Sequence, residues 1–161
     1  ARAAARCIHA VAVLGGQLYA MGGCDGGSLS SVERYDPALD AWEAVAPMAA
    51  ARRAHAVAVH DGKLYAVGGF NGGILSSVER YDPAGDAWEA AAPLTLARCG
   101  AGAAALEGER YAVGGRGEED DEAAEVDRPA NTVERFDPAT NIWEEVAPMV
   151  TARSAPWVAL L

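Results

Sequence analysis

The sequence predicts an all-β fold in which four-stranded antiparallel sheets repeat along the chain and stack radially as the blades of a β-propeller segment. The main observation is an internal repeat: LYAMGGCDGGSLSSVERYDPALDAWEAVAPM, residues 18–48, returns 46 positions later as LYAVGGFNGGILSSVERYDPAGDAWEAAAPL. A third copy begins at Tyr111 and continues, after an interruption, as TVERFDPATNIWEEVAPM. Its tryptophan, Trp143, follows Trp88 by 55 positions instead of 46, so this copy carries an insertion. A fixed period of this length is typical of repeat architectures.

The first half of each unit predicts a β-hairpin. Its first strand is an apolar run of the type HAVAV, and its second strand is LYAMGG or a close variant, ending at a pair of glycines. Between the two runs lies a two-residue turn of the kind that requires positive φ angles. These turns are Gly15–Gly16, Asp61–Gly62 and Glu107–Gly108.

The second half of each unit predicts two further strands, of the types SVERYDP and AWEAVAP. An Asp-Pro pair ends the first of them, because proline pre-sets φ for a turn and the aspartate accepts a hydrogen bond from the turn backbone. The three pairs are Asp36–Pro37, Asp82–Pro83 and Asp137–Pro138. One four-stranded sheet cannot bury both of its faces alone, whereas radial stacking of such sheets buries them against one another.

The order of these markers resembles the Kelch repeat. The markers are a glycine pair, a YDP or FDP turn, and a tryptophan six residues after the aspartate of that turn, and they recur in phase in three units. The resemblance implies blades whose first strand lines a central channel and whose fourth strand is outermost. We expect one partial propeller over residues 1–161. Its units are 6–51, 52–97, 98–152 with an acidic insertion at 116–130, and the first strand of a fourth unit at 153–161.

The number of units is low for a closed ring. Closed propellers have four to eight blades, and the Kelch domains that this sequence resembles most often have six. Three sheets would leave two apolar faces exposed, which favours association. The segment is therefore either part of a longer propeller, which we favour, or half of a ring completed by a second copy. The fourth unit departs from the pattern, with Pro156 at the position of His9 and His55 and Trp157 at the position of a small residue.

Composition and charge exclude several classes of function. The formal net charge is −10, which argues against sequence-independent nucleic-acid binding because such binding needs a basic surface. No stretch approaches eighteen apolar residues, so no membrane span is predicted, and the opening ARAAARCIHAVAV is not interpreted as a signal peptide. The three cysteines are odd in number and lack CxxC spacing, which indicates a reducing compartment and a cytoplasmic location.

No catalytic residue and no cofactor are predicted. The motif GGCDGG is not a phosphate-binding loop, because a Walker loop needs GK[ST] at the start of a helix. We interpret its glycines as structural: without Cβ atoms they would let a ring of the adjacent blade approach the backbone. Ser28–Ser31 have no histidine in register that could activate a nucleophile. The copper radical oxidase that shares this fold needs a set of Tyr, His and Cys ligands that is not found here, so an enzyme remains an alternative only through further blades.

Other repeated polar residues are interpreted as structural. His9 and His55 share one repeat position but no third ligand shares their register, so no metal site is predicted. The strand-leading arginines are expected to bind carbonyls of the adjacent blade, with contact to a ligand as the alternative. The Glu-Arg pairs of the third strands are expected to form ion pairs between blades. These residues are Arg6, Arg52, Arg98 and Arg153, and Glu33–Arg34, Glu79–Arg80 and Glu134–Arg135.

The candidate binding site lies at the positions where the units differ. In Kelch proteins that bind peptides, the pocket at one mouth of the channel uses the residue after the glycine pair, the loop that follows, and the residue after the strand-leading arginine. The alternative is that loops vary because little constrains them. By this resemblance the partner-binding residues are Cys7, Cys24, Leu29, Arg53, Phe70, Leu75, Cys99, Arg116 and Ser154.

The insertion of the third unit is strongly acidic. Between Arg116 and Arg128 it contains seven carboxylates, namely Glu118, Glu119, Asp120, Asp121, Glu122, Glu125 and Asp127. Dense like charge without apolar anchors is typical of a solvated loop, and the spacing of an EF-hand calcium loop is absent. We expect this loop to repel acidic ligands or to attract a basic segment of a partner.

These observations together predict a non-enzymatic module that binds a protein or peptide at the mouth of a propeller. The resemblance is closest to the animal Kelch-like proteins, whose propellers select substrates for a cullin-based ubiquitin ligase through BTB and BACK domains that this sequence does not contain. An actin-binding propeller and a Kelch-type oxidase or sugar isomerase are the alternatives. A lip combining Phe70, Leu29, Leu75 and Ile74 with Arg53 and Arg116 would suit a peptide that carries apolar and acidic side chains.

Overall fold

The computed structural model of the chain describes residues 5–117 and 130–154, and these residues form β-strands, turns and loops. Four strands make up each of three sheets. The first sheet consists of β1 (Ala10–Leu14), β2 (Gln17–Met21), β3 (Val32–Asp36) and β4 (Ala41–Val45). The second consists of β5 (Ala56–His60), β6 (Lys63–Val67), β7 (Val78–Asp82) and β8 (Ala87–Ala91). The third consists of β9 (Gly102–Leu106), β10 (Glu109–Val113), β11 (Val133–Asp137) and β12 (Ile142–Val146).

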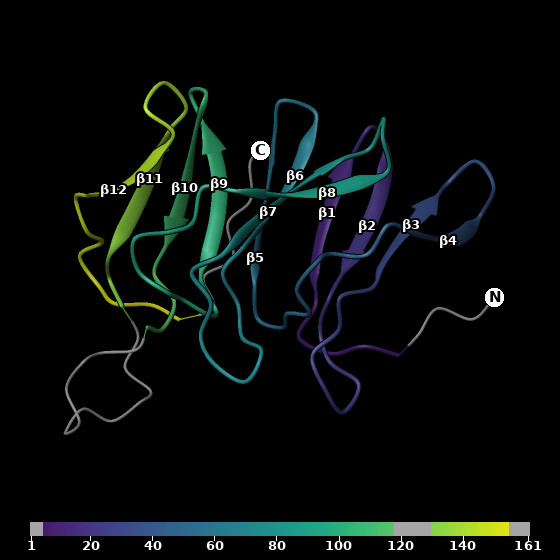
Figure 1. The fold of residues 1–161 in the computed structure, drawn as a ribbon, viewed down its shortest axis with the longest axis horizontal. Helices are drawn as coiled ribbons and strands as arrows, with labels where there is room; N and C mark the ends of the chain where they lie inside the picture. Colours follow the sequence, from purple (N-terminus) through teal and green to yellow (C-terminus); the bar gives the residue numbers. More distant parts are fainter. Residues whose placement is uncertain (1–4, 118–129, 155–161) are drawn as a thin grey trace.

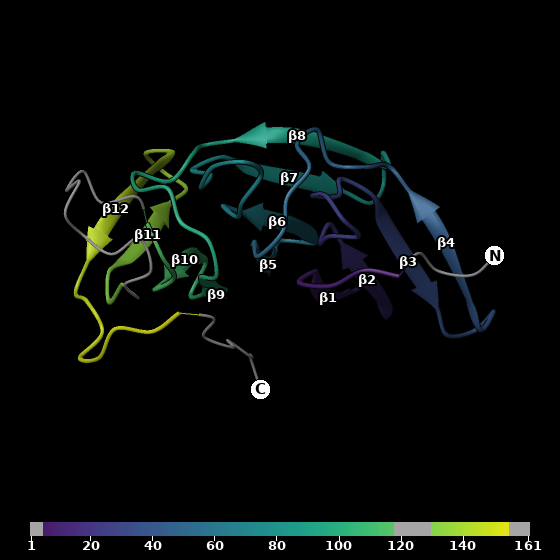
Figure 2. The same ribbon diagram turned by 90° about the horizontal axis from the view of Figure 1, so that it is seen from below.

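Each sheet is an antiparallel meander in which the strands follow one another in chain order. We refer to the three sheets as blades 1, 2 and 3. They lie side by side along an arc, with β1, β5 and β9 on its concave side and β4, β8 and β12 on its convex side (Figures 1 and 2). This arrangement confirms the predicted all-β fold of four-stranded blades. No helix within the described ranges is long and apolar enough to cross a membrane.

The predicted turns are confirmed by the backbone angles. Both residues of each β-hairpin turn have positive φ, for example 60° and 76° at Gly15 and Gly16 and 48° and 68° at Asp61 and Gly62. Each Asp-Pro aspartate accepts a hydrogen bond from the amide two residues later, as Asp36 Oδ1 does from Ala38 N at 2.8 Å. The third strand of each unit therefore ends where proline and aspartate were expected to end it.

Two apolar layers join the blades. Between blades 1 and 2, Tyr19 and Met21 pack with Met48 against Leu64 and Tyr81. The rings of Tyr19 and Tyr81 meet edge to face, with their centroids 5.9 Å apart, an arrangement that aromatic rings prefer. A second layer, between blades 2 and 3, includes Tyr65, Leu94, Phe136 and Trp143. The alanine-rich strands thus obtain a core from a few large side chains placed at the seams between blades.

The glycine pairs are structural, but the reason differs from the one predicted. A Cβ on Gly22 would lie 2.4 Å from the carbonyl oxygen of Arg52, and one on Gly68 would lie 2.3 Å from that of Arg98. The second glycine of each pair donates its N–H to the same oxygen, since Gly23 N lies 2.9 Å from Arg52 O and Gly69 N lies 2.9 Å from Arg98 O. A backbone carbonyl at the start of the next unit therefore occupies the space, and only at Gly22 does a ring, that of His55, approach as well.

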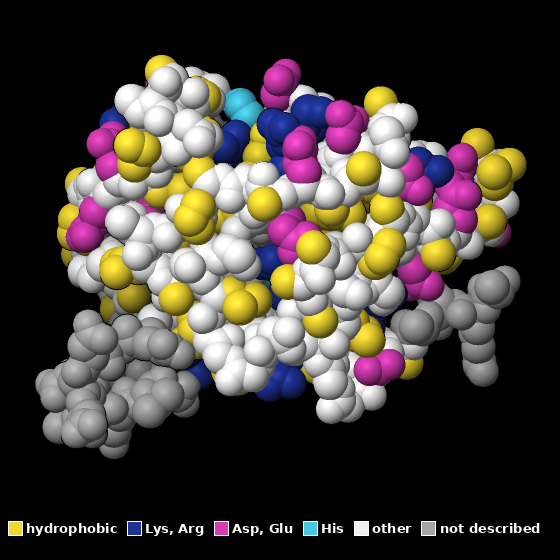
Figure 3. All heavy atoms as spheres, viewed as in Figure 1, with side chains coloured by type: hydrophobic (Ala, Val, Ile, Leu, Met, Phe, Trp, Pro, Cys, Tyr) yellow, Lys and Arg dark blue, Asp and Glu magenta, His cyan; other side chains and the backbone are white. Residues whose placement is uncertain are grey.

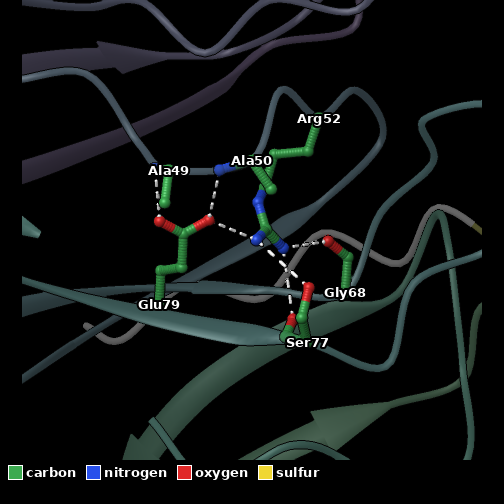
Figure 4. Close-up of polar contacts among 6 residues, drawn as sticks. All are labelled: Ala49, Ala50, Arg52, Gly68, Ser77 and Glu79. Atoms are coloured by element: carbon green, nitrogen blue, oxygen red, sulfur yellow. Dashed lines mark hydrogen bonds and ion pairs between the residues drawn. The ribbon is translucent and has the colours of Figure 1, made fainter. Parts of the chain in front are cut away.

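The repeated Arg-Glu pairs also differ from the prediction. Arg52 donates to Gly68 O at 2.7 Å, to Ser77 O at 3.1 Å and to Glu79 Oε1 at 2.6 Å, all within its own unit (Figure 4). Arg6 and Arg98 bind their own units in the same way. The expected ion pairs between blades and the expected arginine contacts to an adjacent blade are therefore wrong.

The connection between units is made by the glutamate instead of the arginine. Glu79 accepts hydrogen bonds from the backbone amides of Ala49 at 2.6 Å and Ala50 at 3.0 Å, which belong to the end of the first unit (Figure 4). Because its carboxylate also binds Arg52, one buried side chain links both units. The companion arginine of the third strand, such as Arg34, faces outward and pairs with Glu43 of β4.

His55 is buried at the seam between blades 1 and 2. The residue is 7% exposed, and neither ring nitrogen has a hydrogen-bond partner within the described part of the chain. Burial, followed by the charges of Arg52 and His9, lowers the pKa of His55 from 6.5 to about 3. The imidazole is therefore neutral at physiological pH and acts as an apolar packing group.

Acidification is expected to destabilise the chain through His55. Between pH 6.5 and about 3 the unfolded chain binds a proton at this position and the folded chain does not, so the free energy of unfolding falls as the pH falls. The expected slope is about 1.4 kcal/mol per pH unit for one proton. Urea unfolding at pH 6, 5 and 4 measures it. His55→Ala, which reproduces the alanine that the third unit has at position 101, should show a slope smaller by this amount, and equal slopes would contradict the assignment.

Candidate functional site

The predicted site positions are brought together in pairs. Outside the named strands, the residue after each strand-leading arginine pairs with the residue after the glycine pair of the same unit. In each of these backbone pairs the two residues exchange two N–H···O hydrogen bonds. The N···O distances are 3.0 and 2.8 Å for Cys7 with Cys24, and 3.1 and 2.9 Å for Arg53 with Phe70. For Cys99 with Arg116 they are 2.9 and 2.8 Å. Three equivalent backbone pairs therefore hold six side chains at one end of the blades, and the residue types of these side chains differ between units.

The loop leucines are held at the seams between units. Leu29 donates its N–H to Gly23 O at 2.9 Å, and its carbonyl accepts from Arg52 N of the next unit at 2.9 Å. Leu75 repeats both bonds, with Gly69 O at 2.8 Å and Arg98 N at 3.1 Å. Both leucines are half-buried. Their backbone therefore fixes the loop, and part of each side chain remains available at the surface.

Blade 2 has the best-defined polar and apolar surface at this end. The guanidinium carbon of Arg53 lies 4.8 Å from the centroid of the Phe70 ring, within the range of a cation–π contact. Phe70 also bridges to Ile74, and its carbonyl accepts a hydrogen bond from Ser28 Oγ of the first unit at 3.1 Å. Basic side chains emerge along the lower end of the blades in Figure 3, where the loops after the glycine pairs lie in Figure 1. A cation beside an apolar ring can bind a carboxylate and an apolar side chain together.

A family model described as the Kelch motif matches the chain three times, over residues 5–49, 51–95 and 97–150. The chain belongs to the Kelch-repeat family. Kelch repeats form protein-binding propeller modules, and this membership confirms the family that the glycine, Asp-Pro and tryptophan markers indicated.

Similar proteins carry the same repeat. The chain is 56% identical over 41 residues to Kelch-like protein 35 of Homo sapiens and 54% identical over 41 residues to Kelch-like protein 35 of Mus musculus. Each match spans 25% of this chain and only 7% of the relative. The solved structure of YjhT superposes with a TM-score of 0.75 at 19% identity, covering 92% of this chain and 54% of that chain. At this level of identity the likeness shows a common fold.

The first Kelch unit places two thiols side by side. Cys7 is exposed and Cys24 half-buried, and neither forms a disulfide. Each thiol lies near the other residue's carbonyl oxygen, at 3.3 Å for Cys7 Sγ and 3.5 Å for Cys24 Sγ. A side-chain hydrogen bond between the protonated Cys24 thiol and Cys7 is the main cause that raises the pKa of Cys24. Cys24 is therefore less easily ionised than an ordinary cysteine, which does not favour a role as a nucleophile.

Three predicted features lie at or beyond the edge of the described residues. Ser154 is half-buried and follows Arg153, whose carbonyl accepts a hydrogen bond from Gly115 N at 2.9 Å. It thus continues the Kelch pattern at the end of the described residues. Residues 118–129 of the acidic insertion, and Pro156 and Trp157, lie outside the described residues.

No metal centre is visible among the side chains that the structure describes: no group of three His, Cys, Asp or Glu side chains is placed to hold an ion. His9 is exposed whereas His55 is buried, so the two equivalent histidines have different surroundings. The first unit has no preceding blade in the structure to cover its histidine, which accounts for this difference.

The sequence prediction missed Arg110 in β10. Its guanidinium lies between two rings, 4.1 Å from the Tyr65 centroid and 3.8 Å from the Phe136 centroid. Arg110 as a whole is 7% exposed, and burial lowers the pKa of its guanidinium. Within the described ranges it has no carboxylate partner, so the rings stabilise the cation. Leu18 and Leu64 occupy the same repeat position in the first two units. The replacement of this leucine by Arg110 in the third unit was the signal in the sequence that could have revealed it.

Proposed function

We propose that this Kelch segment binds a peptide or protein segment at the end of the blades where the glycine-pair loops lie. The observation that supports the proposal is the set of three reciprocal backbone pairs. They hold Cys7 and Cys24, Arg53 and Phe70, and Cys99 and Arg116 in the same register on a uniform scaffold. Different side chains at equivalent positions give an asymmetric surface, and an asymmetric surface suits one specific ligand.

The ligand is proposed to carry an acidic and an apolar side chain close together. Arg53 and Phe70 are in contact, so a carboxylate on the guanidinium would lie next to an apolar group on the ring. Arg116 offers a second basic side chain one unit further along the arc, and Leu29 and Leu75 add apolar surface at the seams. Charge-assisted hydrogen bonds to arginine would orient the ligand, and the apolar contacts would contribute most of the affinity.

The cellular role is proposed to be substrate recognition for a cullin-based ubiquitin ligase in the cytoplasm. This proposal relies on the similarity to Kelch-like protein 35, which covers a quarter of the chain. The cullin would be contacted by domains outside this propeller segment, and the propeller itself would act without catalysis or cofactor. The acidic insertion would repel acidic ligands that do not match the arginines, or attract a basic segment of the partner.

Replacement of Arg53 tests the binding surface. Peptides selected by the purified chain from a random display library would be measured against the chain by calorimetry. Arg53→Ala is expected to weaken the selected peptides about tenfold or more, because a hydrogen bond to a charged group contributes about 1.5–3 kcal/mol. Arg116→Ala is expected to act in the same direction.

The matched control is Arg34→Ala. Arg34 lies in β3 and pairs with Glu43 of β4, away from the glycine-pair loops, so its removal should leave peptide affinity unchanged. Unchanged affinity in both Arg53→Ala and Arg116→Ala would overturn the proposed site. Selection of purely basic peptides would overturn the proposed ligand chemistry.

A further inference from the structure

The first unit places two of its residues, both cysteines, opposite each other in one backbone pair. Cys7 N donates to Cys24 O at 3.0 Å, and Cys24 N donates to Cys7 O at 2.8 Å. In an antiparallel pair that exchanges both hydrogen bonds, the two Cα atoms are about 5.5 Å apart. Disulfides join residues whose Cα atoms are about 4.4–6.8 Å apart. The backbone therefore already has the spacing that a disulfide between these two residues requires.

The two sulfur atoms lie across the same pair. Residues directly opposite each other in an antiparallel pair project to one face. Cys7 Sγ lies 3.3 Å from the carbonyl oxygen of Cys24, and Cys24 Sγ lies 3.5 Å from that of Cys7. The two side chains also share a hydrogen bond. Rotation about the Cα–Cβ bonds is therefore enough to join the sulfurs, without movement of the backbone.

The backbone pair does not need cysteines to form. The same two repeat positions hold Arg53 and Phe70 in the second unit and Cys99 and Arg116 in the third, with the same reciprocal hydrogen bonds. The thiols are also not core groups, because Cys7 is exposed and Cys24 is half-buried. Neither scaffold nor packing accounts for two cysteines that face each other.

Reagents in solution can reach this pair. Cys24 is half-buried. Arg53 and Cys99 share the repeat position of Cys7 and follow another blade, and both are half-buried as well. Partial exposure is therefore a property of this position in every unit, and it does not depend on what precedes blade 1.

We propose that Cys7 and Cys24 are a redox modification site, at which a small disulfide such as oxidised glutathione closes a reversible bond between the two sulfurs. The Cys7 thiolate attacks one sulfur of the small disulfide, which forms a mixed disulfide and expels one thiolate. The Cys24 thiolate then attacks the Cys7 sulfur and expels the second thiolate. Overall the two cysteine thiols lose two electrons and two protons, and the small disulfide is reduced to two thiols.

The contacts of the pair favour this order of attack. In the reduced pair the hydrogen bond with Cys7, followed by burial, raises the pKa of Cys24, so the exposed Cys7 reacts first. Once the Cys7 sulfur is in the mixed disulfide, its thiol proton is gone and this hydrogen bond with it. Arg53 of the next unit lowers the pKa of Cys24, because a nearby cation favours the thiolate. That thiolate completes the bond.

The bond would tie the segment that leads into β1 to the loop after the glycine pair. In reducing compartments, disulfides of this kind are typically transient and redox-sensing. The proposal does not depend on the peptide-binding function, because it concerns a bond between two residues of the chain itself.

Incubation of the purified, folded chain with oxidised glutathione tests the proposal. The chain has three cysteines, and a thiol titration after denaturation should find that only the thiol of Cys99 remains. The intact mass should decrease by two hydrogen atoms, and dithiothreitol should restore both thiols. Chymotrypsin cleaves after Tyr19, between the two cysteines, so a digest should contain two peptides joined through Cys7 and Cys24.

Two serine variants separate the pair from the individual thiols. Cys24→Ser should retain glutathione on Cys7, because no second sulfur displaces it. Cys99→Ser is the matched control: Cys99 has the repeat position of Cys7 but faces Arg116, so this variant should form the Cys7–Cys24 bond as the unchanged chain does. An unchanged number of thiols, a stable glutathione adduct on the unchanged chain, or disulfides between chains or to Cys99 would each overturn the proposal.

Discussion

Alanine at position 68 is expected to destabilise the chain by about 3 kcal/mol. Gly68 has a φ of 62°, and a Cβ there would lie 2.3 Å from the carbonyl oxygen of Arg98. The left-handed conformation costs a non-glycine residue about 1–2 kcal/mol. The carbonyl must also move, which breaks its 2.9 Å hydrogen bond from Gly69 N at a cost of about 1 kcal/mol or more. Urea unfolding of the variant measures the sum.

Gly72→Ala is the control for backbone strain. Gly72 has a φ of 76° in the loop after the same glycine pair, but no heavy atom lies within 4 Å of a Cβ built on it. This variant should lose only the conformational cost of about 1–2 kcal/mol. The difference between the two variants then reports the contact with Arg98. Equal losses would show that the seam tolerates the extra carbon atom and that the glycine pair is needed only for its φ angles.

The fold followed from the sequence because its determinants are local and repeated. Each strand is ended by residues next to it in the sequence. These are a two-residue turn with positive φ, an Asp-Pro pair, and a proline after the fourth strand. The contacts between blades are less local. Gly68 was correctly interpreted as a structural glycine. The group that approaches it, however, is the carbonyl of Arg98, 30 positions along the chain. A periodic sequence pattern does not tell whether a carbonyl or a ring will occupy the space.

The candidate site was predictable in its register and less so in its contacts. The resemblance to peptide-binding Kelch proteins placed Arg53 and Phe70 in one surface, and the structure pairs their backbones. Glu79 was assigned the wrong partner, because a strand pattern gives the face of a side chain and not the element that covers it. Arg110 was overlooked because it occupies a position that is apolar in the other two units, where only a comparison of units could reveal it.

Glu79→Gln is expected to destabilise the chain by about 3–5 kcal/mol. The Arg52 side chain is fully buried and that of Glu79 is 6% exposed, and removing one partner of a buried pair leaves the other charge uncompensated. Both carboxylate oxygens accept, Oε2 from Ala49 N and Oε1 from Ala50 N and Arg52. A glutamine side chain has one oxygen and one NH₂ group in place of the two oxygens. At least one of the three N–H donors named above would therefore face this NH₂ group and lose its hydrogen bond.

The control is Glu89→Gln, which removes the charge from an exposed pair of the same blade. Arg80 and Glu89 are 38% and 55% exposed, and exposed pairs contribute about 1 kcal/mol or less. Urea unfolding at pH 7 compares the two variants. A loss at Glu79 no larger than that at Glu89 would mean that water reaches the Arg52 guanidinium. The seam would then be held by its apolar layer and by its remaining hydrogen bonds, such as the one from Gly23 N to Arg52 O.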